Sequence, residues 1–232
     1  MTTRMKSKYK SILYSLFFLC LIGCHNRQSA DIYPYKINPK ADIYYQQALS
    51  LLVYYDKDST RKCINLLDKA LEIDSLNPDY YGTKAKLFVE LGLLDSALII
   101  QRYANQIGAI NGEYLLQLGL FQAAKGFPAE AHESFKRSNE YLKRVLGKYP
   151  DSLGAFINQQ AANSLYLGID SVFMSNIKNI RKQFPNRLMD IEMTRRLKPS
   201  SLILQIRKIE ENSIYDLAVD LENQLRESSE IK

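Results

Sequence analysis

Few residues of this chain have the types and spacing that catalysis or metal binding requires. The two histidines are His25 and His132, and the residues one helical turn from His132 are Pro128 and Lys136, so it has no second ligand at helical spacing. Residues 56–59 alternate oxygen ligands like the start of a calcium loop but lack its glycine and closing glutamate. A plain turn between helices is the simpler interpretation. The sequence contains no Gly-rich phosphate loop and no G-x-S-x-G elbow. We therefore expect no catalytic residues, no metal and no cofactor, and a protein that is not an enzyme.

Cys24 is the residue whose surroundings indicate a chemical role. Residues 1–10 contain four basic side chains and no acidic one, residues 12–22 are almost wholly apolar, and Gly23 comes directly before Cys24. A basic start followed by a short apolar run is typical of an export signal. The run is too short for a membrane-spanning helix, which needs about 20 apolar residues.

The end of this segment, Leu21-Ile22-Gly23-Cys24, resembles the lipobox of bacterial lipoproteins. The resemblance implies cleavage before Cys24, a diacylglycerol on its sulfur, and attachment to a membrane through lipid. Each buried acyl methylene contributes about 0.8 kcal/mol, so several chains make attachment effectively permanent. His25, rather than Asp, follows the cysteine, which in the enterobacterial sorting pattern implies the outer membrane and a domain facing the periplasm. The alternative is an ordinary secretory signal or an uncleaved anchor with a chance cysteine.

Removing the predicted signal peptide, residues 1–23, changes the charge balance. The chain has 31 basic and 25 acidic residues, and four of the basic ones lie in the signal, so 27 remain against 25 and the formal charge falls from +6 to +2. This small excess gives no reason to expect a nucleic-acid partner. With Cys24 lipidated, Cys63 is the one cysteine left, so no intramolecular disulfide can form. Its apolar neighbours predict a buried side chain.

The rest of the chain is organised by a period of 34 residues. Gly92 and Gly126 are 34 apart, as are Ala97 and Ala131. Apolar residues recur at helical spacing between these points, and such a period indicates stacked supersecondary units. The pattern resembles the tetratricopeptide repeat (TPR), a helix-turn-helix of 34 residues. The units that this resemblance implies are 44–77, 78–111, 112–145 and 154–187.

The same alignment assigns residues to the points where helices turn or pack closely. Repeat position 8, a small residue in the family, holds Leu51, Ala85, Gly119 and Ala161. The turn at position 15 holds Asp58, Gly92, Gly126 and Gly168. Close-packing position 20 holds Cys63, Ala97, Ala131 and Phe173. Position 27 holds Ala70, Ala104, Ser138 and Ile180. After the third unit the helix is expected to run on to a break at 149–150, and residues 146–153 are an insertion. Asp95 and Ser96 are expected to cap the second helix of their unit.

The expected fold is therefore all-α, a short TPR-like helical solenoid with a C-terminal capping helix. Residues 24–41 contain two prolines and little periodicity, which predicts a lipidated tether. Residues 42–187 hold the four repeats, and residues 188–232 form a helical cap whose long helix runs from Leu202 to Leu225. A solenoid needs a terminal cap with a polar outer face. The alternative is that this helix pairs with a partner.

With catalysis unsupported, the functional surface expected is a binding face. In the TPR family the first helix of each unit lines a concave face. The resemblance implies partner contacts from Tyr45, Leu52, Tyr55, Lys86, Glu113, Leu116, Leu120 and Asn158. The family's clamp for a terminal carboxylate is not reproduced by Lys86 and Asn158. An apolar peptide or partner helix could lie in the groove. Alternatively, residues 32–35 or the C-terminal helix could fill it.

The sequence thus predicts a lipid-anchored scaffold of the cell envelope that binds a protein or peptide partner on its concave face. Two alternatives remain open. One is an immunity-type or accessory lipoprotein that neutralises a toxin. The other is a regulatory subunit of an envelope enzyme.

Overall fold

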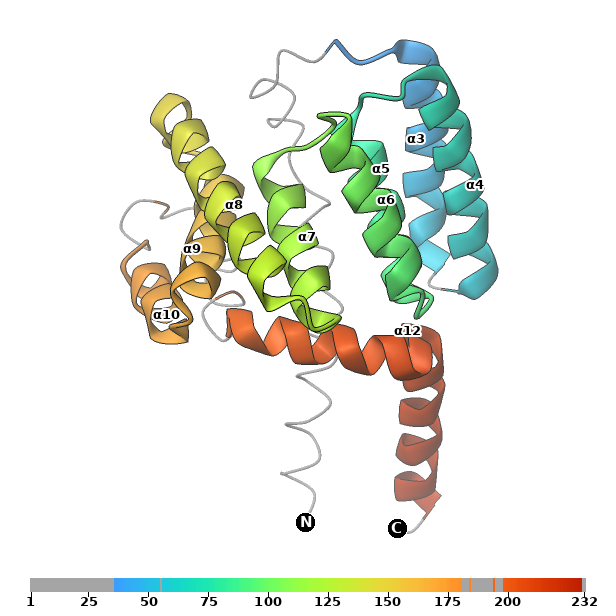
Figure 1. The fold of residues 1–232 in the computed structure, drawn as a ribbon. Coiled ribbons are helices and arrows are strands. Elements are labelled where there is room, and N and C mark those ends of the chain that lie inside the picture. Colours follow the sequence, from blue (N-terminus) through green and yellow to red (C-terminus); the bar gives the residue numbers. More distant parts are fainter. Residues whose placement is uncertain (1–35, 55, 181–183, 185–193, 195–197, 231–232) are drawn as a thin grey trace.

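The computed structural model describes residues 36–54, 56–180, 184, 194 and 198–230, with the backbone alone at 214–215 and 217–230. Within these ranges every regular element is helical and no strand occurs (Figure 1). The predicted all-α class is confirmed. The predicted signal peptide, Cys24, most of the tether, Tyr55 and the end of the fourth unit lie outside the described residues.

Most of the described chain consists of helix pairs that follow one another in sequence. The pairs are α3 (Pro39–Leu51) with α4 (Lys57–Ile73), α5 (Pro78–Glu90) with α6 (Leu94–Gln106), α7 (Gly112–Ala124) with α8 (Pro128–Lys148), and α9 (Leu153–Leu167) with α10 (Asp170–Asn179). A short 3-10 turn, η1 (Leu52–Tyr54), follows α3. Within each pair the two helices pack against each other, and α7 also packs against α5, α6 and α9. α8 runs on to Lys148, as the sequence predicts for the insertion.

The first helix of each pair begins at a polar side chain that caps it. The side chains of Asn38, Asn77, Asn111 and Ser152 each accept a hydrogen bond from a backbone N–H of the first turn, at 3.0, 3.0, 2.9 and 3.4 Å. Such caps contribute about 1 kcal/mol each. Asn38 precedes Pro39, a residue suited to the first helical position. The predicted tether boundary at residue 41 is therefore wrong, because α3 begins at residue 39.

The turns inside the second, third and fourth pairs share one geometry. Gly92, Gly126 and Gly168 have φ of 78°, 81° and 70°. The N–H of the next residue donates to the carbonyl five residues earlier in every case, at 2.8, 2.8 and 3.0 Å. These are Schellman motifs, in which a left-handed glycine ends the helix. The predicted turn glycines at these three positions are confirmed.

The remaining helix starts differ from the expectation at one point. Asp56 caps α4, and its Oδ1 accepts from the backbone N–H groups of Asp58 and Ser59 at 3.0 and 2.8 Å. Residues 56–59 are thus a helix cap. Asp95 and Ser96 do not cap α6, which begins after Leu93 with no side-chain cap bond, because the Schellman turn leads directly into the helix.

The close-packing positions are buried in all four pairs. The residues at positions 20 and 27 are each at most 2% exposed. In the third pair a Cβ on Gly119 would lie 3.2 Å from the carbonyl oxygen of Ala131, so only glycine fits there without displacement. In the first pair the small buried residue is Ala48, whose carbonyl accepts from Cys63 Sγ at 3.1 Å, whereas Leu51, at the predicted position 8, is partly buried against the same cluster. Cys63 is buried as predicted, and burial raises its thiol pKa to about 11.

The C-terminal helix α12 (Pro199–Glu230) crosses the helix pairs. It packs against α5, α7 and α9, and its first half runs beneath their lower ends in the view of Figure 1. Leu202, Ile206 and Ile209 are buried in the main core. Arg207 donates from Nε and Nη2 to the carbonyls of Ala124 and Ala123, both at 2.9 Å. The described part of this helix therefore closes the turn edge of the array, which differs from a cap stacked on the last pair.

A sharp break at Ser213 divides α12. Ser213 has φ 51° and ψ 160°, a conformation that non-glycine residues rarely adopt. Its hydroxyl donates to Asp216 Oδ2 at 2.6 Å, and Lys57 Nζ lies 2.7 Å from Oδ1 of the same carboxylate. On the other side of the break, Lys125 Nζ lies 2.8 Å from both Glu210 and Asp95. These contacts link α12 to the first, second and third pairs.

Two turn glycines offer a matched test of this arrangement. A Cβ on Gly92 would lie 3.2 Å from the carbonyl oxygen of Ile209, whereas a Cβ on Gly126 would meet nothing within 4 Å. Both substitutions to Ala incur the left-handed backbone cost of about 1–2 kcal/mol. We expect Gly92→Ala to lower the free energy of unfolding by more than Gly126→Ala, because it also displaces α12. Urea unfolding and amide exchange of residues 202–210 measure this, and equal losses with unchanged exchange would contradict it.

Candidate functional site

The first helices α3, α5, α7 and α9 form the face that the sequence predicts for binding, here called the A-face. Two of its predicted contacts are wrong. Leu116 and Leu120 are 1% and 2% exposed and belong to the main core. The physical reason is the position of α7, which packs against α5, α8, α9 and α12 and so has little free surface. Neither leucine side chain is available to a partner.

Three other predicted residues have mainly internal contacts. Lys86 is buried, and its Nζ lies 4.0 Å from Glu90 Oε1 one turn further along α5. Leu52 is half-buried in the core of the first pair. Tyr45 is half-buried, with its hydroxyl 3.3 Å from Thr83 Oγ1 and its ring centre 5.0 Å from that of Tyr80. Tyr55 is outside the described residues.

The structure does bring Glu113 and Asn158 together, and it adds two residues that the predicted set omits. The A-face polar cluster consists of Asp79 on α5, Glu113 and Tyr114 on α7, and Asn158 on α9. Tyr114 donates its hydroxyl hydrogen to Asp79 Oδ1 at 3.1 Å, and the Asn158 side chain hydrogen-bonds Glu113. The period places Asp79 at the same concave-face position as Glu113, because it stands 34 residues earlier.

Gly82 explains how Tyr114 reaches across α5. A Cβ at this position would overlap the Tyr114 ring. A glycine inside a helix costs about 0.5–1 kcal/mol relative to alanine. Here that cost is offset by room for a buried aromatic ring whose hydroxyl orients the Asp79 carboxylate.

The electrostatics of the cluster are unusual for a partly exposed surface. Burial raises the pKa of Glu113 to about 7, the nearby Asp79 carboxylate adds to this rise, and the Asn158 hydrogen bond opposes it. Burial also raises the pKa of Asp79, against the hydrogen bond from Tyr114. Among the described residues no Lys or Arg forms an ion pair with either carboxylate. The cluster can therefore accept hydrogen bonds from a cationic group, which would stabilise both ionised forms.

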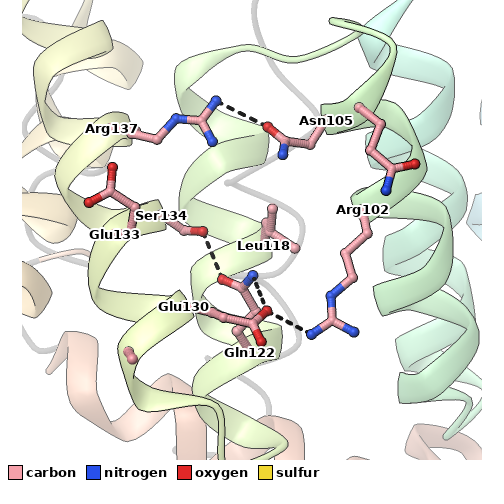
Figure 2. Close-up of a pocket in the computed structure, with 10 residues that line it drawn as sticks. Arg102, Asn105, Leu118, Gln122, Glu130, Glu133, Ser134 and Arg137 are labelled. Carbon is pink, nitrogen blue, oxygen red and sulfur yellow. Dashed lines mark hydrogen bonds and ion pairs between the residues drawn. The ribbon is translucent and has the colours of Figure 1, made fainter.

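A cleft between α6 and α8 is a second candidate site (Figure 2). It has a volume of about 450 Å³, and the lining residues are Arg102, Asn105, Gln106, Leu118, Gln122, Ala129, Glu130, Glu133, Ser134 and Arg137. The binding positions of the repeat family all lie on the first helices of the units, so they do not indicate this cleft. Most lining residues lie on the second helices, and no motif marks them.

A hydrogen-bond network organises this cleft (Figure 2). Arg102 Nη2 donates to Glu130 Oε2 at 2.7 Å, and Gln122 Nε2 donates to the same oxygen at 3.2 Å. Ser134 donates its hydroxyl to Gln122 Oε1 at 2.7 Å. At the other end Arg137 Nη2 donates to Asn105 Oδ1 at 3.1 Å. The polar side chains are thus held in defined orientations around the opening.

Other chemistry receives no support within the described ranges. They contain no group of three or more His, Cys, Asp or Glu side chains placed to hold a metal ion. The His132 ring contacts the Tyr166 ring in a tilted arrangement, with ring centres 4.6 Å apart. No helix in the described part of the chain combines the length and apolar character needed to cross a bilayer.

Comparison of the sequence and the structure with protein-family models, curated proteins and solved structures gives no match.

The raised pKa of Glu113 leads to a testable effect on stability. In the unfolded chain this carboxyl ionises near 4.5, and in the folded protein near 7. The folded state therefore binds more protons between these values, and stability falls as pH rises through them. Glu113→Gln removes this loss. Because Glu113 is partly exposed, we expect a gain of only about 1–2 kcal/mol at pH 8 and little change below pH 4.5.

Urea unfolding at pH 4 and pH 8 measures this difference. Glu133→Gln, at an exposed residue of α8, is the matched control and should leave the pH dependence unchanged. An equal effect of Glu113→Gln at both pH values would contradict the assignment.

Proposed function

We propose that this protein is a lipid-anchored scaffold of the cell envelope, built as a short TPR-like solenoid, that binds a basic segment of a protein or peptide at its A-face polar cluster. In this proposal Cys24 carries the lipid, and residues 25–38 connect it to the first helix. The domain then works beside a membrane. The expected location is the outer membrane, with the domain facing the periplasm.

The repeated architecture supports the solenoid part of the proposal. Four consecutive helix pairs bury equivalent positions, and two of them repeat the same cap and turn at a spacing of 34 residues. A single pair cannot bury its apolar face, so the pairs must stack. Arrays of this kind present extended surfaces that bind other proteins.

One observation carries the binding part. Asp79 and Glu113 come from consecutive pairs at the same repeat position, and both are partly exposed. Carboxylates in such surroundings are costly to ionise without a compensating charge. A Lys or Arg side chain, or a terminal amine, would supply that charge. Partner binding should therefore strengthen as pH rises through 7.

Site-specific crosslinking tests the binding proposal. The full-length protein, in its native membranes, would carry a photoreactive phenylalanine derivative in place of Tyr45, which adjoins α5 through Thr83. We expect one crosslinked partner that disappears when Asp79→Asn and Glu113→Gln are combined. The same label at Ile99, which is 69% exposed on α6, is the positional control. A crosslinking pattern unaffected by the two charge removals would contradict the proposal.

The anchor has its own test. Cys24→Ser should abolish incorporation of labelled palmitate and release the protein from the membrane fraction, because each lost acyl methylene removes about 0.8 kcal/mol of membrane binding. Cys63→Ser is the matched control, since the Cys63 thiol is buried and is not part of a disulfide. Unchanged labelling of Cys24→Ser would rule out lipidation at this residue.

A further inference from the structure

The cleft between α6 and α8 differs from the A-face in position and in chemistry. Its floor is Leu118 on α7, which is 3% exposed, and its walls come from the second helices of two pairs. Gln122 and Ser134, at 5% and 4% exposed, are buried polar side chains bonded to each other. A volume of about 450 Å³ lies within the range of sites that hold small ligands or short peptide segments.

At one end of the cleft the charged side chains are paired with each other. Arg102 is paired with Glu130 at 2.7 Å, and its guanidinium lies 5.1 Å from the centre of the Phe127 ring. Gln122 donates to the same Glu130 oxygen. The charges at this end therefore cancel, and its groups are held in place.

The other end has hydrogen-bond donors to spare. Arg137 donates to Asn105 at 3.1 Å, a neutral acceptor, and no carboxylate pairs with it among the described residues. A guanidinium has five N–H donors in a planar fork that matches a carboxylate. The Asn105 side-chain amide adds two more. Glu133, one turn earlier on α8, lines the same cleft and limits how strongly an anion is attracted.

We propose that this cleft binds an extended peptide segment whose carboxylate contacts Arg137. The side-chain amides of Asn105 and Gln106 line it, and an amide can both donate to and accept from a peptide backbone. This mixture favours a peptide over a bare anion, which would use only the donors at the Arg137 end. Inorganic phosphate shares the donor chemistry and is therefore an arm of the test.

The experiment uses the full-length protein in detergent micelles with ¹⁵N-labelled arginine, asparagine and glutamine. The probes are acetyl-Ala-Ala-Asp-Ala-amide, its Asn counterpart and inorganic phosphate. We expect the Asp peptide to shift the side-chain signals of Arg137, Asn105 and Gln106 in a saturable manner. The Asn peptide should bind at least tenfold more weakly, because hydrogen bonds to a charged group are the stronger ones.

Variants sharpen the result in two directions. Arg137→Gln should weaken the Asp peptide at least tenfold, while Arg144→Gln, an exposed arginine of the same helix that stacks on Tyr141, should not. Glu133→Gln should strengthen binding severalfold by removing a nearby negative charge. Circular dichroism spectra identical to those of the unchanged protein confirm that each variant is folded.

Several outcomes would overturn the proposal. These are no saturable shift with the Asp peptide, equal binding of the Asp and Asn peptides, or an unchanged affinity in Arg137→Gln. Phosphate binding as tight as that of the Asp peptide would assign the cleft to small anions and reject the peptide. The A-face is tested separately, by crosslinking from position 45.

Discussion

The packing of α12 across the turn edge is the contact on which the rest of the described structure depends. In an array of helix pairs each unit touches only its neighbours, so stability is approximately a sum of local terms. Here one helix buries Leu202, Ile206 and Ile209 in a core shared with the second, third and fourth pairs. Arg207 donates to two carbonyls at the end of α7, and one of them, that of Ala123, also accepts from the backbone N–H of Gly126 at 3.2 Å. A local stack is thereby joined by contacts between residues far apart in sequence.

This constraint also explains why the turns carry glycine. The Schellman turn at Gly92 lies against the carbonyls of Ile209 and Glu210, so both its left-handed backbone and its lack of a Cβ allow α12 to pack there. At Gly126 only the backbone conformation requires glycine. The same residue at the same repeat position thus meets two different physical demands, and the period alone does not distinguish them.

The sequence predicts the local architecture well, and the long-range packing poorly. Helix pairs, turn glycines and the buried positions of Ala97 and Ala131 follow from short-range periodicity, which depends on residues a few turns apart. The crossing of α12 depends on which surfaces meet in three dimensions. Amphipathic spacing predicts that this segment is helical, but not which helices it packs against. The errors at Leu116 and Leu120 have this origin, since a family position that lines an open face becomes core when α7 is surrounded on several sides.

The candidate site shows the same division. Glu113 and Asn158 were predicted because they occupy binding positions of the repeat family, while Tyr114 belongs to the cluster through its contact over Gly82. Predicting that contact requires the distance between α5 and α7, and no spacing in the sequence gives this distance. The cleft between α6 and α8 was not predicted at all, because it results from the packing of three helices.

Both candidate sites share α7, and this has a mechanical consequence. Glu113 and Tyr114, near its start, belong to the A-face polar cluster. Leu118 and Gln122, further along the helix, line the cleft. α7 is buried along most of its length and packs on α5, α6, α8, α9 and α12. Close-packed interiors transmit displacement because they contain few voids to absorb it. A ligand that shifts α7 at one site must therefore change the free energy of ligand binding at the other site. Such coupling is reciprocal for binding at equilibrium. The sign of the coupling follows from whether the two ligands favour the same position of α7.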